Sequence, residues 1–170
     1  MADLEERVRL LEDRLDIEEL VIRYFRAIDA MDMAEVTSMF AADARFGEQV
    51  GREAIVEFQG ASRRAMGVAI HTPHYVDVVF DGHDRAVGAV GAHCELERGG
   101  ACLVGALRYN DSYVRSPGGW VFAARDVEYF FLCPWAEVDT SLTAAQRVRW
   151  PGEQSRDATL PRFQSGASRG

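Results

Sequence analysis

Two residues far apart in the sequence have side chains suited to proton transfer. Asp29 lies in the largely apolar segment AIDAM, and His71 lies in IHTP. An imidazole with a near-neutral pKa is a suitable general base, and a neighbouring carboxylate holds its tautomer and stabilises the imidazolium that forms. Burial of Asp29 next to His71 would therefore form a catalytic Asp–His pair. The alternative is a solvated Asp29 at a helix C-terminus, where the helix dipole disfavours a carboxylate.

Tyr24 is the third candidate catalytic residue. It precedes Asp29 by five positions, about 140° around a helix, so the two side chains flank one cavity only if the helix frays or turns near Ala30. A buried tyrosine hydroxyl needs a hydrogen-bond partner, and in a lyase this could be the leaving oxygen of the substrate. Ordinary packing in the core is the alternative for Tyr24.

Three further residues are candidates for substrate binding: His93, Arg125 and Tyr129. His93 has small neighbours on its face of an expected strand, a pattern typical of a cavity floor and equally of a core histidine. Arg125 and Tyr129 share one face of the last expected strand, because side chains alternate with a period of two. A buried arginine requires an anion or a carboxylate partner. The alternative for Arg125 is therefore a structural ion pair, for instance with Asp29.

No pattern in the sequence predicts a metal site or a cofactor. The four histidines include no i, i+4 pair on a helix, and no Gly-rich phosphate loop follows a strand. The three cysteines, Cys94, Cys102 and Cys133, lack metal-ligand spacing and are expected to be reduced thiols of a cytoplasmic protein. We therefore expect neither a metal nor a cofactor.

Charge and hydropathy argue against two classes of partner. The net charge of −8, without a basic stretch that contains aromatic residues, argues against nucleic acid. No apolar run reaches the roughly 18 residues of a membrane span, and no basic leader precedes an apolar stretch. With 48% hydrophobic residues the chain can bury a sizeable core. We expect a cytoplasmic protein whose ligand is small and largely apolar.

The candidate residues depend on secondary structure that the apolar pattern predicts. Apolar residues at helical spacing predict helices over residues 3–29, 33–41 and 52–63. In the last of these, Ile55, Val56 and Phe58 are expected to face inward.

The pattern changes after Gly67 to extended runs rich in Val, Tyr and Phe, separated by turns that contain glycine. These runs predict an antiparallel meander with strands over residues 74–80, 85–96, 101–114 and 120–132. Helices followed by hairpins indicate an α+β fold. We expect one domain over residues 1–150 and a flexible Gly-, Ser- and Arg-rich tail over residues 151–170.

Three segments resemble the SnoaL-like branch of the nuclear-transport-factor-2-like (NTF2-like) superfamily: IEELVIRYFRAIDAMD, AIHTPHYVDVVFDG and YNDSYVRSPGGWVFAARDVEYF. The resemblance implies a cone-shaped fold, in which a curved antiparallel or mixed sheet and N-terminal helices enclose a pocket. This branch includes bile acid dehydratase, lindane dehydrochlorinase and scytalone dehydratase. The same scaffold also hosts isomerases, polyketide cyclases and proteins without catalytic activity.

The resemblance also implies roles for individual residues. Asp29 and His71 match the aspartate and histidine with which these enzymes remove a proton beside a leaving group, and Tyr24 matches the tyrosine of the dehydratase. Arg125 falls where the dehydrochlorinase has a pocket arginine, whereas Tyr129 stands where the dehydratase has its own pocket arginine. The resemblance implies elimination without metal or cofactor.

These observations lead to one leading functional hypothesis and two alternatives. We expect a cofactor-independent lyase that dehydrates a small, apolar, hydroxylated substrate of polyketide or steroid type, as in secondary metabolism. The alternatives are a polyketide cyclase or isomerase that uses the same Asp–His pair, and a ligand-binding domain without turnover. We also expect a homotrimer, with a homodimer as the alternative, because the helix-free face of a curved sheet leaves apolar surface to cover.

Overall fold

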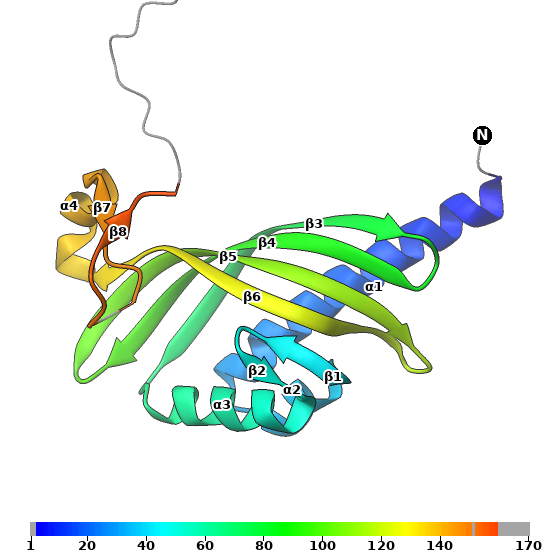
Figure 1. The fold of residues 1–170 in the computed structure, drawn as a ribbon, viewed down its shortest axis with the longest axis horizontal. Coiled ribbons are helices and arrows are strands. Elements are labelled where there is room, and N and C mark those ends of the chain that lie inside the picture. The colour runs from blue at the N-terminus through cyan, green and yellow to red at the C-terminus, as the bar shows by residue number, and fades with distance from the viewer. Residues whose placement is uncertain (1–2, 151, 160–170) are drawn as a thin grey trace, which may run out of the picture.

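The computed structural model describes residues 3–150 and 152–159 and has the α+β architecture that the sequence predicts (Figure 1). The first helices are α1 (Leu4–Asp29), α2 (Met33–Ser38) and α3 (Arg52–Arg64). The main sheet contains β1 (Phe40–Phe46), β2 (Gln49–Val50), β3 (Ala69–Asp81), β4 (Arg85–Arg98), β5 (Ala101–Ser116) and β6 (Gly119–Pro134). The C-terminal segment contains η1 (Trp135–Glu137), α4 (Val138–Thr143), β7 (Gln146–Arg147) and β8 (Arg156–Asp157).

The main sheet is mixed and curved, and its strand order is β2-β1-β6-β5-β4-β3. Strands β3 to β6 form the predicted antiparallel meander, and β1 pairs with β6 in parallel. The register of β5 and β6 shifts between Ala106 and Leu107 and again between Ser112 and Tyr113. Such bulges bend a strand and increase its twist. Together with the helices that pack on it, the bent sheet forms the cone-shaped fold that the resemblance implies (Figure 1).

Helix α1 carries Asp29 to the core. It begins where the sequence predicts because Asp3 caps it, with Oδ1 of Asp3 accepting a hydrogen bond of 2.9 Å from the backbone N–H of Glu6. The apolar face of its second half, which includes Val21 and Phe25, is buried against the sheet. The helix continues to Asp29, which therefore lies at the edge of the core.

The second helix is shorter than predicted, and the two strands that follow it, β1 and β2, were missed. Helix α2 ends at Ser38, whereas the apolar pattern extended the helix to Ala41. Phe40 instead begins β1 and pairs with Phe122 of β6. An apolar run as short as this one has no period that distinguishes a helix from a strand. After the turn that follows β1, strand β2 pairs with β1 in antiparallel.

Strand β3 begins earlier than predicted, at Ala69 rather than at His74, so His71 lies inside the strand. Pro73 is tolerated inside β3 because β3 is an edge strand, where a missing N–H need not cost a hydrogen bond of the sheet. Helix α3 has nearly the predicted bounds and buries Ile55 as expected. Phe58 faces Phe46, with ring centroids 6.3 Å apart, although 45% of its surface is exposed.

The C-terminal segment packs back along the sheet. The backbone N–H of Leu132 in β6 donates a hydrogen bond of 3.1 Å to the carbonyl oxygen of Val148, and β7 pairs with β8. Strand β8 belongs to the region that the sequence assigns to a flexible tail. Residues 151 and 160–170 of that tail lie outside the described residues. Among the residues that are described, no helix combines the length and the apolar character needed to cross a membrane.

Candidate active site

Asp29 and His71 are in direct contact. Oδ1 of Asp29 lies 2.6 Å from Nδ1 of His71, and Oδ2 accepts a hydrogen bond of 2.8 Å from the backbone N–H of His71. The carboxylate therefore holds both the ring and the backbone of one residue, which fixes the direction of the imidazole. When Nδ1 donates its proton to Asp29, Nε2 carries a free lone pair, which is the form of a general base.

Neighbouring residues hold this pair in place. The ring of Phe25 stacks on His71, with ring centroids 5.6 Å apart and planes 22° from parallel. Arg63 of α3 donates from Nε to the carbonyl oxygen of Ile28 (3.0 Å) and from Nη2 to that of Asp29 (3.4 Å). Carbonyls in the last turn of a helix lack partners within the helix. Arg63 therefore caps the end of α1 that carries Asp29.

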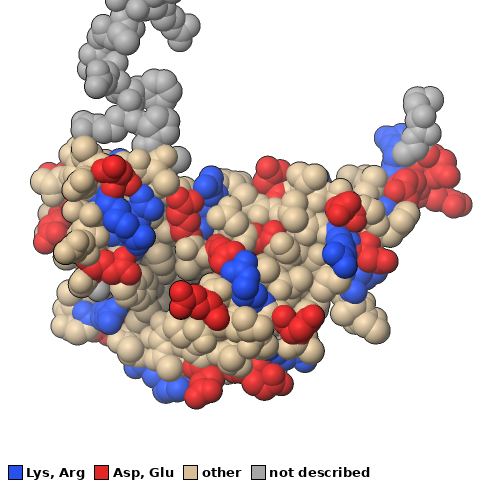
Figure 2. All heavy atoms as spheres, in the orientation of Figure 1, with Lys and Arg blue, Asp and Glu red and all other residues tan. Residues whose placement is uncertain are grey.

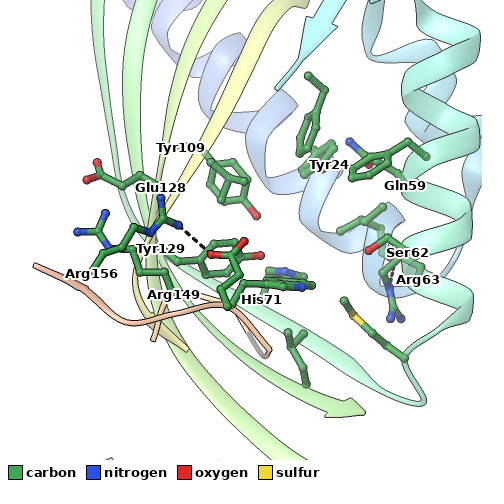
Figure 3. A pocket seen from close by; sticks show the side chains of 18 residues that line it. Tyr24, Gln59, Ser62, Arg63, His71, Tyr109, Glu128, Tyr129, Arg149 and Arg156 are labelled. Carbon is green, nitrogen blue, oxygen red and sulfur yellow. Dashed lines mark hydrogen bonds and ion pairs between the residues drawn. The ribbon is translucent and has the colours of Figure 1, made fainter. Parts of the chain in front are cut away.

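His71 lines a cavity of about 510 Å³ whose walls are α1, α3, the curved sheet and the C-terminal segment (Figure 3). Its apolar lining includes Ile28, Phe46, Phe58, Leu96, Val127 and Trp150. A mostly apolar wall with a few polar groups is typical of a site for a small molecule.

Three tyrosines line the cavity: Tyr24, Tyr109 and Tyr129. Burial raises the pKa of each of them above its ordinary value. All three are therefore neutral at physiological pH and can donate hydrogen bonds, but they release a proton reluctantly. Figure 3 shows Tyr109 and Tyr129 on the sheet side of the cavity.

The hydroxyl of Tyr24 has a partner within the protein. It donates a hydrogen bond of 3.0 Å to Oε1 of Gln59, and both side chains are buried. Gln59 and Arg63 lie one turn apart on α3 and both line the cavity. Nε2 of Gln59 and Nη1 of Arg63 have no acceptor among the residues that the structure describes. The α3 wall therefore contains two buried N–H groups near the cavity.

Arg125 does not line the cavity, so its proposed role in substrate binding is not supported. Its guanidinium is fully buried and donates to both carboxylate oxygens of Asp111, from Nε at 2.8 Å and from Nη2 at 2.9 Å. Cζ lies 4.3 Å from the ring centroid of Tyr24 and 4.2 Å from that of Tyr109. The structural ion pair was the correct alternative, although the partner is Asp111 and not Asp29.

His93 lies on the outer face of the sheet, so the suggested place on a cavity floor was wrong. Its side chain is exposed, and its Nδ1 contacts Nε2 of His74 on β3. Along β4 the inward positions belong to the other set of alternating residues, which includes Cys94. Tyr129, in contrast, lines the cavity, where its ring centroid lies 5.3 Å from that of Trp150.

The cysteines do not contribute reactive groups to the cavity. Cys94 and Cys133 are buried, and Cys102 is exposed. Burial raises the pKa of Cys94 to about 12, so this side chain is an unreactive thiol. Within residues 3–150 and 152–159, no three His, Cys, Asp or Glu side chains are grouped so that they could hold a metal ion.

Several residues of the cavity wall were missed in the sequence. Arg149, Glu153 and Arg156 of the C-terminal segment line the cavity, and Arg156 donates to Glu153 at 2.9 Å. Nothing in the local composition of this segment marks it as part of a wall. Gln59 and Arg63, in contrast, follow Ile55 at intervals of four and so continue the buried stripe of α3. Polar residues in such a stripe are a signal that could have identified them.

The sequence profile of the SnoaL-like domain matches residues 9–126. The chain is similar to the solved structure of a hexachlorocyclohexane dehydrochlorinase from Novosphingobium barchaimii, with 20% identity and a TM-score of 0.70 over 76% of this chain and 94% of the other. It is similar to a scytalone dehydratase-like protein from Novosphingobium aromaticivorans, with 15% identity and a TM-score of 0.70 over 76% and 91% of the two chains.

A further similar structure is an NTF2-like protein with a cystatin-like fold from Novosphingobium aromaticivorans. It shares 28% identity and a TM-score of 0.62 over 75% of this chain and 90% of the other. No curated protein sequence matches the chain. The structural neighbours thus include lyases. The similarity to the dehydrochlorinase and to the scytalone dehydratase-like protein concerns the fold alone.

Proposed function

Because this chain belongs to the SnoaL-like domain family, we propose that it is a lyase that removes water from a small, largely apolar, hydroxylated molecule without a metal or cofactor. The observation that carries the proposal is the contact between Asp29 and His71 at the wall of a mostly apolar cavity. A dehydrochlorinase and a scytalone dehydratase-like protein among the structural neighbours support elimination as the class of reaction.

The proposed reaction needs only one base and a site for the leaving group. Nε2 of His71 takes a proton from the carbon next to the one that bears the hydroxyl, and the C–H electron pair becomes the new C=C bond as the C–O bond breaks. Asp29 stabilises the imidazolium that forms. The imidazolium then gives its proton to the departing oxygen, so that water leaves and His71 returns to its starting state.

Tyr24 assists the leaving oxygen through a hydrogen bond. Because burial raises the pKa of Tyr24, its hydroxyl keeps its proton and acts as a hydrogen-bond donor. To reach the leaving oxygen it exchanges its bond to Gln59 for one to the substrate. The N–H groups of Gln59 and Arg63 suit a second oxygen of the substrate, such as a carbonyl, as a hydrogen-bond acceptor. A hydroxylated polycyclic or polyketide-like ketone combines these features.

The proposal is tested by the mass of the product. Purified protein is incubated with a panel of hydroxylated polycyclic ketones and β-hydroxy ketones, and the mixtures are analysed by mass spectrometry. We expect a product that has lost one water. A product of unchanged mass would instead indicate an isomerase, and retention of a ligand without conversion would indicate a binding domain.

We predict that Tyr24→Phe lowers turnover by about 10-fold, less than changes to Asp29 or His71, because it removes a hydrogen bond and leaves the base intact. Steady-state kinetics checks this, and substrates with poorer leaving groups should show the larger loss. Tyr113→Phe is the matched control. It removes a buried hydroxyl that donates to Asp111 outside the cavity, so turnover should be unchanged. Equal losses in the two variants would contradict a role for the Tyr24 hydroxyl.

A further inference from the structure

Helix α1 has an apolar stripe that the rest of the described chain does not cover. The stripe consists of Leu4, Val8, Leu11, Leu15 and Ile22, each of which is between 43% and 70% exposed. The N-terminal end of α1 stands out from the body of the protein (Figures 1 and 2). Apolar side chains of this size, gathered on one exposed face, mark an interaction surface.

The body holds α1 by its opposite side, so the stripe points away from the sheet. Residues two positions after members of the stripe, about 200° around the helix, are buried: Asp13, Ile17 and Tyr24. Asp13 accepts a hydrogen bond of 3.1 Å from Nε1 of Trp120. Arg14 donates to the carbonyl oxygen of Val78 at 3.1 Å.

The spacing of the stripe is that of a coiled coil. Val8, Leu15 and Ile22 recur every seven residues, and Leu4 and Leu11 form a second row with the same repeat. Two interleaved rows of this kind are the a and d positions of a heptad. The first row contains the β-branched Val8 and Ile22, and the second contains leucine, which is the combination that favours two parallel strands. Glu18 occupies the next place in the leucine row, so the continuous seam ends at Leu15.

The charges beside the stripe indicate both the partner and its direction. One flank carries Glu5, Glu12 and Glu19, and the other carries Arg7 and Arg14, again at intervals of seven. These are the e and g positions, which form ion pairs across a coiled coil. In a parallel pair each g position faces the e position five residues later on the other helix, so an arginine meets a glutamate. In an antiparallel pair like charges would meet.

We propose that the stripe on α1 binds the same stripe of a second copy of this chain, as a short parallel two-stranded coiled coil. Each helix offers the apolar seam, the glutamate flank and the arginine flank that its copy requires, so the surface is complementary to itself. The two bodies lie on opposite outer sides of the paired helices. Of the two assemblies left open by the sequence, this pairing favours the homodimer over the homotrimer.

The first test measures the mass of the assembly in sedimentation equilibrium. The double variant Leu11→Glu, Leu15→Glu places four negative charges in the seam of a pair, and we expect an assembly of half the wild-type mass. Both side chains are more than 60% exposed, so the fold should persist, as checked by circular dichroism. Val87→Glu is the matched control, because Val87 is an exposed apolar residue on the sheet and its change should leave the mass unaltered. A double variant with the wild-type mass would overturn the proposal.

The second test measures direction. Leu4→Cys is introduced together with Cys102→Ser, which removes the exposed native thiol. A parallel pair places residue 4 beside its own copy, so mild oxidation should yield a disulfide-linked dimer on a non-reducing gel. An antiparallel pair centred on the seam separates the two ends and would give none. Absence of the cross-link would overturn the parallel arrangement, and a cross-linked dimer supports it even if the double variant fails to fold.

Discussion

Replacement of His71 by alanine is expected to lower turnover by about 100-fold or more, the usual scale for a positioned general base, while substrate binding changes little. The physical reason is that, among the residues described, His71 is the histidine that lines the cavity, whereas the apolar wall that binds the substrate remains. The measurement is kcat and KM for any substrate that the mass test identifies. His74→Ala is the matched control, since His74 is exposed on the outer face of the same strand. Its turnover should equal that of the wild type.

Asp29→Asn should be nearly as severe, because asparagine keeps the size of the side chain but loses the charge that stabilises the imidazolium. Since Asp29 holds His71 through both the ring and the backbone, the two residues should act as a unit. The double variant His71→Ala, Asp29→Asn is then scarcely worse than the worse single variant. Additive losses would assign separate roles to the two residues. Folded single variants that turn over like the wild type would refute the mechanism.

The elements of the fold and the site residues that could be predicted are marked by patterns of neighbouring residues or by motifs that the family shares. Helix α1 has a capping Asp3 and a regular apolar period, and the meander is marked by glycine turns between its strands. Asp29 and His71 could be paired because the resemblance supplied the contact that spacing alone does not show. The contact between them is the one that a histidine acting as general base requires, because a carboxylate orients its ring.

The parts that could not be predicted depend on which strands meet and on which face each strand buries. The alternation along β4 correctly grouped His93 with small residues, but alternation does not tell which of two faces is inside. For Arg125 the pattern indicated burial and a carboxylate partner, yet the choice of Asp111 required the register of β5 and β6, where the two residues stand directly opposite each other. The wall formed by Arg149 and Trp150 required the path of the C-terminal segment, which local composition does not encode.

Arg125 was expected to bind substrate, but its buried ion pair with Asp111 gives it a structural role. Burial is the largest single influence on the pKa of Arg125 and lowers it, but the charge and hydrogen bonds of Asp111, together with Tyr24 and Tyr109, raise the pKa by more, so the guanidinium stays charged in the core. The rings of Tyr24 and Tyr109 lie against this cation. The ion pair therefore links β5 to β6, and the guanidinium packs against two of the tyrosines that line the cavity.

Asp111→Ala is accordingly expected to lower the free energy of unfolding by about 3 to 5 kcal/mol, because it leaves the guanidinium of Arg125 buried without an anion. Urea denaturation monitored by circular dichroism measures this loss. Asp126→Ala is the matched control: Asp126 forms an ion pair with Arg45, but both side chains are more than 40% exposed, and such pairs contribute about 0–1 kcal/mol. The double variant Asp111→Leu, Arg125→Met removes both buried charges and should recover much of the lost stability. If Asp111→Ala costs no more than Asp126→Ala, Arg125 has another partner in solution, and its assignment as a purely structural residue fails.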